Sequence, residues 1–127
     1  MRFALAIILA AHGVAHLVGF VSSWQLAALP ELPYKTTIFA GRLDVGDVGM
    51  RTIGVLWLLA ALMFLVAAIA MALQVTWAVR LTLVGLVASL LMCVAGWPDT
   101  RIGLALNVGL LFLLVIEGRL RLFTLSP

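Results

Sequence analysis

Residues 52–73 read TIGVLWLLAALMFLVAAIAMAL, an apolar stretch of 22 residues without a charged side chain. A helix needs about 20 such residues to cross the hydrocarbon core of a bilayer, which is roughly 30 Å thick. Three other apolar stretches lie at about 3–23, 77–96 and 102–116; the second of these contains one charge, Arg80, one turn from its start, and the last is short. We therefore predict an all-α integral membrane protein, a bundle of four transmembrane helices that forms one domain over residues 1–127.

The composition supports a membrane protein and excludes several other classes. Hydrophobic residues make up 65% of the chain, charged residues 10%, and the mean hydropathy is +1.26. A soluble domain carries about 25% charged residues, so too few remain here to cover a surface in water. The net charge of +3 is scattered over the ends of the spans and forms no basic patch for nucleic acid. Cys93 is the only cysteine, which excludes an intrachain disulfide.

The ends of the spans bear on targeting and orientation. Arg2 and the apolar residues after it resemble the start of a signal peptide, but the stretch continues to Val21 without a small-residue cleavage site. We expect it to remain as a helix. The acidic residues lie mainly on the side opposite the termini, whereas Lys and Arg divide equally between the two sides. We predict a multi-pass protein of the inner (plasma) membrane with cytoplasmic termini. The cations of the terminal side are Arg2, Arg80, Arg119 and Arg121, and those of the opposite side are Lys35, Arg42, Arg51 and Arg101.

The residue usage also indicates a source. Arg is preferred over Lys, and Ala, Leu, Val and Gly are abundant, which suggests a bacterium with a GC-rich genome. In length and hydropathy the chain resembles small bacterial four-helix membrane proteins, DoxX-like ones among them. The resemblance rests on this outline and carries no motif, so it implies no functional residue.

The polar residues between the spans are concentrated in one loop, at about 25–50. Pro30 and Pro33 prevent a continuous helix there. Asp44 and Asp47 would share a face if their segment were helical, and Asp47 is placed to cap the second helix. A long loop in a chain otherwise reduced to its spans is where binding or catalytic residues are expected. The alternative is an interfacial re-entrant loop whose Arg and Asp residues pair with one another.

Each predicted span has one helical face of mainly small or polar residues, and we expect these faces to point inward. Larger apolar side chains cover the other faces and would contact lipid. The inward faces consist of His12, His16, Gly19, Phe20 and Ser23 in the first span, Gly54, Trp57, Ala61, Ala68 and Ala72 in the second, Thr82, Gly85, Ser89, Cys93 and Gly96 in the third, and Gly103 and Asn107 in the fourth.

Counting residues from the span ends, at about 1.5 Å per residue, predicts a polar pocket in the half of the bundle beneath the 25–50 loop. His12 would lie nearer the bilayer centre and be more isolated. The residues expected at the level of the pocket are His16, Trp57, Ser89, Cys93 and Asn107. Those expected to form its mouth are Arg42, Asp44, Asp47 and Arg51.

The two histidines carry the best clue to chemistry, because hydrocarbon offers no water to an imidazole. His12 and His16, four residues apart, can bind one transition-metal ion from one helix face, with Asp44, Asp47 or Cys93 as a third ligand. Haem at a subunit interface is a further option. His16 can also act as a base that the loop acids tune. The alternative to all three is structural, with both imidazoles bonded to carbonyls or to Ser and Asn on neighbouring helices.

These observations leave three hypotheses, and the first is favoured. In the first, the chain is a non-enzymatic accessory protein or a subunit of a larger membrane complex or homo-oligomer, and His12 and His16 tolerate Gln or Asn. In the second, it is a small membrane enzyme, or a protein that binds a metal, a porphyrin or a small molecule through His16, His12 and the Asp44/Asp47 loop. There, His16→Gln abolishes the activity or the binding. The third is a transporter, which would have to oligomerise because four helices enclose little volume.

Overall fold

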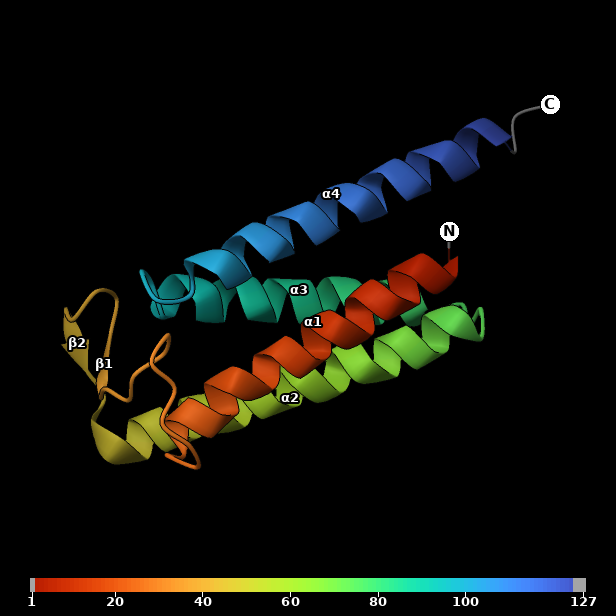
Figure 1. Cartoon of the computed structure of the whole chain (residues 1–127). Helices are drawn as coiled ribbons and strands as arrows, with labels where there is room; N and C mark the ends of the chain where they lie inside the picture. Colours follow the sequence, from red (N-terminus) through yellow and green to blue (C-terminus); the bar gives the residue numbers. More distant parts are fainter. Residues whose placement is uncertain (1, 125–127) are drawn as a thin grey trace.

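A computed structural model describes residues 2–124 of the chain, and the side chains among them up to residue 118. All four helices are long and apolar enough to cross a membrane, so the prediction of an all-α protein with four spans is confirmed (Figure 1). Which membrane holds the protein, and in which orientation, stays a prediction. The helices are α1 (Arg2–Ser23), α2 (Gly46–Ala72), α3 (Ala78–Ala95) and α4 (Arg101–Thr124).

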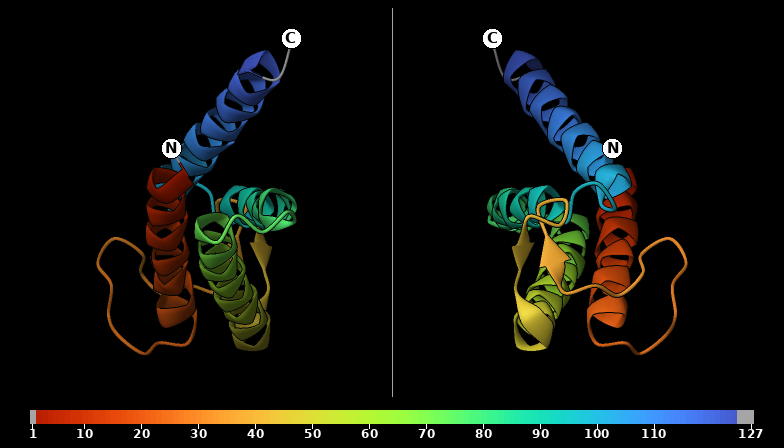
Figure 2. Two further views of the ribbon diagram at one scale, coloured as in Figure 1. Left: turned by 90° about the vertical axis from the view of Figure 1, so that its right-hand side faces the viewer. Right: turned by 90° about the vertical axis from the view of Figure 1, so that its left-hand side faces the viewer.

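The helices pack in chain order, α1 on α2, α2 on α3 and α3 on α4. The start of α1 and the end of α4 lie at one end of the bundle, and the long loop lies at the other (Figure 1). In the side views, α4 is inclined away from α1 and α2 (Figure 2). The buried share of each span falls from 39% in α1 and α2 to 33% in α3 and 22% in α4. The fourth helix is therefore the least covered by protein.

Two helices extend beyond the predicted spans. α2 begins at Gly46 rather than at residue 52, and α4 continues to Thr124 rather than ending near residue 116. Hydropathy marks where a helix meets water, but it does not mark where the helical backbone starts or stops. Asp47 in the first turn of α2 suits the positive end of the helix dipole, so the charged segment extends the helix. The side chains of Arg119 and Arg121, which the orientation argument uses, lie outside the described ones.

The predicted inward faces are buried or half-buried in all four helices. Close approach explains two of the glycines between α1 and α2. A Cβ built on Gly19 would lie 2.5 Å from Cδ2 of Trp57, and one on Gly13 would lie 3.0 Å from the backbone oxygen of Ala61. These contacts are shorter than normal van der Waals distances, so a side chain at either position would force its neighbour to move. Phe64 of α2, fully buried, lies at the centre of the core.

The loop between α1 and α2 contains a short hairpin rather than a helix. Strand β1 (Thr37–Ile38) pairs antiparallel with β2 (Leu43–Asp44). The turn bonds to the end of α3, where the Phe39 amide donates to the Ala95 carbonyl at 2.7 Å and the Ala40 amide to the Trp97 carbonyl at 3.0 Å. These bonds satisfy carbonyls that a helix end leaves unpaired. The loop therefore lies across the end of the bundle.

Candidate functional site

Five buried residues form a hydrogen-bonded cluster that joins α1, α3 and α4: His12, His16, Ser89, Cys93 and Asn107. The rings of His12 and His16 meet edge to face, with centroids 4.6 Å apart. His12 Nε2 lies 3.0 Å from Oδ1 of Asn107. His16 Nε2 lies 2.6 Å from Oγ of Ser89. Asn107 Nδ2 donates to Ser89 Oγ at 2.7 Å and to Cys93 Sγ at 3.5 Å, which completes the cluster.

The directions of these bonds assign the tautomer of His16. Its Nδ1 lies 2.8 Å from the backbone oxygen of His12, and a carbonyl only accepts, so Nδ1 carries the proton. In the neutral ring the other nitrogen, Nε2, is then an acceptor. Ser89 donates its hydroxyl to that nitrogen and accepts the amide of Asn107. Both ring nitrogens of His16 are thus occupied by protein groups.

The same reasoning leaves one nitrogen of His12 without a partner. The amide of Asn107 donates from Nδ2, so its Oδ1 accepts, and His12 must donate to it from Nε2. In the neutral ring Nδ1 is then a lone-pair acceptor. No residue in the described part of the chain bonds to it. His12 is nevertheless only 6% exposed. Nδ1 is not among the enclosed atoms that lack a hydrogen bond, so it keeps some surface of its own although the residue as a whole is buried.

His12 also lines a groove of about 570 Å³ between α1 and α4. The groove exists because α4 is inclined away from α1 (Figure 2). Every other lining residue is apolar, and small residues lie on both walls. The lining consists of Ile8, Ala11, His12, Ala15, Ala105, Leu106, Gly109, Leu110, Phe112 and Leu113.

Aromatic rings of α2 enclose the two imidazoles on the side away from the groove. The Phe64 ring stands nearly perpendicular to that of His12, with centroids 4.7 Å apart, and lies 5.1 Å from that of His16. The Trp57 ring lies 5.3 Å from that of His16. The cluster is therefore closed toward α2.

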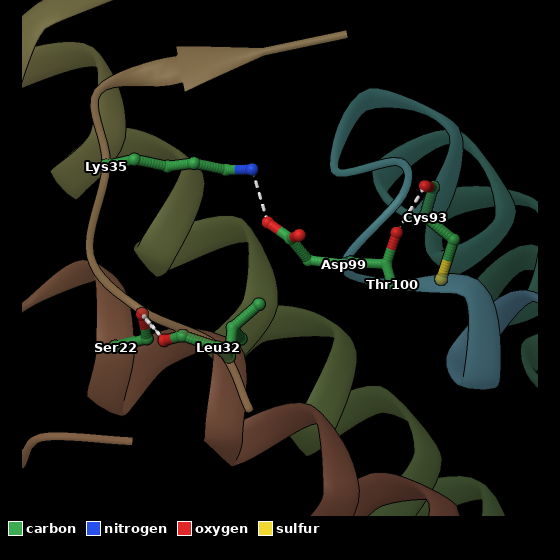
Figure 3. A network of polar contacts seen from close by, with 6 residues as sticks. All are labelled: Ser22, Leu32, Lys35, Cys93, Asp99 and Thr100. Carbon is green, nitrogen blue, oxygen red and sulfur yellow. Dashed lines mark hydrogen bonds and ion pairs between the residues drawn. The ribbon is translucent and has the colours of Figure 1, made fainter. Parts of the chain in front are cut away.

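A second, smaller pocket of about 60 Å³ lies beneath the loop. Lys35 of the loop forms an ion pair there with Asp99 of the α3–α4 turn (Figure 3). Nearby, the Ser22 hydroxyl donates to the Leu32 carbonyl at 2.8 Å (Figure 3). Trp57 lines this pocket and separates it from His16. A pocket does lie beneath the loop, but its polar lining comes from other residues than those predicted.

The four charged residues expected at the mouth are exposed and lie apart from the histidines. The Asp44 carboxylate accepts the Gly46 amide at 3.0 Å, and this bond holds the pKa of Asp44 below its usual range. Asp47 accepts the Tyr34 hydroxyl, which raises the pKa of that hydroxyl. Asp44 lies in β2 and Asp47 in α2, so the segment is not one helix and the condition for a shared helical face is not met. The predicted cap is wrong, because Val45 is the N-cap residue and receives no side-chain bond.

Arg51 and Arg42 have different neighbours at the loop end. The Arg51 guanidinium lies 5.8 Å from the ring centroid of Trp24, whose indole nitrogen donates to the Arg51 carbonyl at 3.2 Å. Arg42 lines a separate groove with Trp97. Neither arginine therefore forms part of the pocket beneath the loop.

The described residues do not form a complete metal site, and the haem hypothesis stays a prediction. Among them, no group of three or more His, Cys, Asp or Glu lies close enough to hold one metal ion. A chelate of His12 and His16 would have to break a bond that His16 makes to the backbone or to Ser89. Cys93 belongs to the cluster, but its sulfur accepts from Asn107. The metal prediction stays a prediction with two candidate ligands.

Sequence reasoning missed two features of this site. His12 is bonded to Asn107 rather than isolated, because inclined helices do not keep equal depth at equal residue counts. Phe64 packs against both imidazoles and was overlooked because only small and polar residues were sought on its face. It follows Trp57 by seven residues and Ala61 by three, the spacing of one helical face, so the pattern contained it.

The fold and the cluster define a small four-helix membrane protein with a polar centre. No known family model, curated protein or solved structure matches the chain. The functional argument therefore rests on the geometry of these residues.

Proposed function

We propose that this protein is a non-enzymatic binding protein of the membrane, which holds a lipid-soluble molecule in the groove between α1 and α4. The ligand carries a hydroxyl or N–H group that donates to His12 Nδ1. One observation carries the proposal: His12, whose Nδ1 accepts no hydrogen bond from the described residues, lies at the wall of an otherwise apolar groove. This agrees with the second sequence hypothesis in part, with His12 in place of His16 as the contact residue.

The size and lining of the groove support a small organic ligand. Sites for such molecules usually measure about 300–1,000 Å³, are mainly apolar and contain a few polar groups that fix orientation. A groove of about 570 Å³ with a single polar residue has this character. Hydrocarbon supplies no competing water, so a ligand that donates to His12 gains a bond unavailable to it in lipid.

The position of the groove supports entry from the bilayer. α4 is the least covered span, at 22% buried, and the groove opens along its side toward α1. A molecule dissolved in the hydrocarbon can therefore reach His12 without crossing the loop. The Asp44/Asp47 segment lies at the end of the bundle and takes no part in this binding.

A pair of photoaffinity probes tests the proposal. The first is a long-chain primary alcohol with a diazirine on its chain, and the second is the methyl ether of the same molecule, which cannot donate a hydrogen bond. After irradiation of the protein in membranes, mass spectrometry locates the labelled residues. We expect the alcohol to label the walls of the groove, including Ala15 and Leu106, about five-fold more than the ether, the effect of one hydrogen bond.

Variants separate the groove from nonspecific labelling. His12→Leu should remove the preference for the alcohol over the ether. Gly109→Leu should block labelling by both probes, because Gly109 lines the groove and a Cβ there meets no atom within 4 Å. Gly118→Leu is the matched control, since that glycine is equally open, lies on the same helix and does not line the groove. Equal labelling by alcohol and ether in the unaltered protein, or unchanged labelling in Gly109→Leu, would refute the proposal.

A second candidate function is the accessory subunit that docks a helix of another protein or of a second copy. The observation in its favour is the small residues at four-residue spacing on both walls, Ala11 and Ala15 on α1 and Ala105 and Gly109 on α4. Such pairs allow close helix packing in lipid. Gly109→Cys in a Cys93→Ser background tests it, because oxidation in membranes should then give a disulfide-linked dimer or a larger adduct. A monomer under these conditions would leave the groove to a small molecule.

A further inference from the structure

We propose that Arg42 and the groove beside it bind an anionic phospholipid of the surrounding bilayer, with the lipid phosphate on Arg42 and an acyl chain along α3 and α4. This site is separate from the groove that contains His12. The groove at Arg42 measures about 470 Å³ and takes its walls from the loop, the end of α3 and the start of α4. Its lining consists of Phe39, Ala40, Arg42, Val94, Trp97 and Leu104.

The charge of Arg42 has no counterion in the described part of the protein. It forms no ion pair there, although four acidic residues, Glu31, Asp44, Asp47 and Asp99, lie at the same end of the bundle. Three of those acids have another partner: Asp44 accepts the Gly46 amide, Asp47 the Tyr34 hydroxyl, and Asp99 pairs with Lys35. The fourth, Glu31, forms no ion pair with Arg42. A cation with no internal partner beside an apolar groove is complementary to a molecule with an anionic head and an apolar chain.

The groove lies where a phospholipid head and its chain would meet. Trp97, 46% exposed, follows the end of α3, and exposed indoles favour the boundary between headgroups and hydrocarbon. Val94 and Leu104 lie inside α3 and α4 and present apolar surface to the groove. The phosphate would thus meet Arg42 at the level of the loop while the chain follows the two helices.

The backbone of the loop holds Arg42 in place beside the groove. Phe39, Ala40 and Gly41 all have positive φ, at 51°, 56° and 83°, a conformation that non-glycine residues rarely adopt. The Arg42 amide closes this turn on the Phe39 carbonyl at 3.2 Å, and the turn bonds to the end of α3 at 2.7 Å and 3.0 Å. Exposed Phe39 and Leu43 lie on either side of Arg42. The tip of the hairpin is therefore an apolar surface with one cation, suited to a membrane boundary.

Lipid retention in native mass spectrometry tests the site. The full chain is released from nanodiscs that contain phosphatidylcholine and phosphatidylglycerol in equal amounts, and the ratio of the two lipids that stay bound is measured. We expect about a five-fold preference for phosphatidylglycerol, the effect of one arginine near an anionic headgroup. Arg42→Gln should bring the ratio close to one. Arg80→Gln is the matched control, because Arg80 is exposed near the opposite end of α3, and it should keep the preference.

A groove variant and a soluble probe complete the test. Val94→Trp fills the groove and should reduce the amount of bound phosphatidylglycerol with Arg42 unchanged. Glycerol 3-phosphate, which has the head but no chain, should not compete with the lipid. An unchanged lipid ratio in Arg42→Gln would overturn the site, and so would retention of phosphatidylglycerol in Val94→Trp at the original level. Competition by glycerol 3-phosphate would identify a phosphate site without a chain and overturn the lipid assignment.

Discussion

α1 packs closely on α2, whereas α4 packs on α3 and leaves a groove on its side toward α1. The space beside the glycines differs between the two helix pairs. At Gly13, Gly19 and Gly54, which lie between the first two helices, an added Cβ would come within 3.0 Å or less of another atom. At Gly109 and Gly118 of α4 it would meet nothing within 4 Å. Close packing holds the first pair together, whereas α4 joins the bundle through the core residues Leu110 and Leu114 and through directed bonds from Asn107.

The comparison shows how one small bundle combines a rigid half with an accessible one. Lipid is as apolar as leucine, so helices in a membrane associate by close packing of small residues and by polar bonds. The α1–α2 pair uses the first device. The bond from His12 to Asn107 ties α4 to α1 by the second and leaves space beside it.

The largest effect is expected from alanine at the two kinds of glycine. Gly19→Ala places a Cβ 2.5 Å from Cδ2 of Trp57, so the indole or the helix must move, and we expect a loss of about 1–3 kcal/mol in the free energy of unfolding. Gly109→Ala meets no atom and gains helix propensity, so its stability should rise by up to about 1 kcal/mol. Unfolding by SDS titration measures both. Equal changes in stability for the two variants would show that the α1–α2 contact is packed no more closely than the surface of α4.

A smaller effect is expected from removing the amide of Asn107. Asn107→Leu deletes its bonds to His12, Ser89 and Cys93. Polar contacts between membrane helices average about 0.6 kcal/mol and reach about 1.7, so we expect a loss of about 1–2 kcal/mol. Spin labels on α1 and α4 should also show a wider distribution of distances. Thr82→Val is the control, because that hydroxyl bonds within its own helix, to Ala78 at 2.9 Å. Comparable losses in the two variants would show that the cluster does not hold α4.

The smallest effect is expected at the loop. Lys35 and Asp99 have side chains that are 37% and 24% exposed, and such pairs contribute about 0.2–1 kcal/mol. Lys35→Met and Asp99→Asn should each cost that much, and the double variant should cost no more than either alone. The effect should shrink in high salt. Additive losses would mean that the two side chains act independently and that the ion pair does not fasten the loop.

The sequence predicted the spans and their inward faces well, because hydropathy and helical spacing report directly on contact with lipid. Counting residues from the span ends placed His16, Ser89, Cys93 and Asn107 at one level of the bundle. Hydrogen bonds do connect these four residues. Whether this cluster binds a ligand stays a prediction.

The groove at His12 could not be predicted, because it depends on the inclination of α4. Packing against α3 and the other helices sets such tilts, and hydropathy does not encode them. The path of the loop could not be predicted from the sequence either. The path depends on hydrogen bonds from Phe39 and Ala40 to the end of α3. These bonds join segments far apart in the sequence, so no local sequence pattern predicts them.

The bonds of the two imidazoles have a consequence for biogenesis. Synthesis proceeds from the N-terminus, so α1 enters the bilayer before the chain that supplies Ser89 and Asn107 has been made. Phe64 and Trp57 of α2 arrive first and place aromatic rings beside both histidines. Insertion of the hairpin is thus expected to leave two polar rings awaiting partners. Ser89 of α3 then bonds to His16, and Asn107 of α4, the last helix to be made, bonds to His12 and completes the hydrogen-bonded cluster.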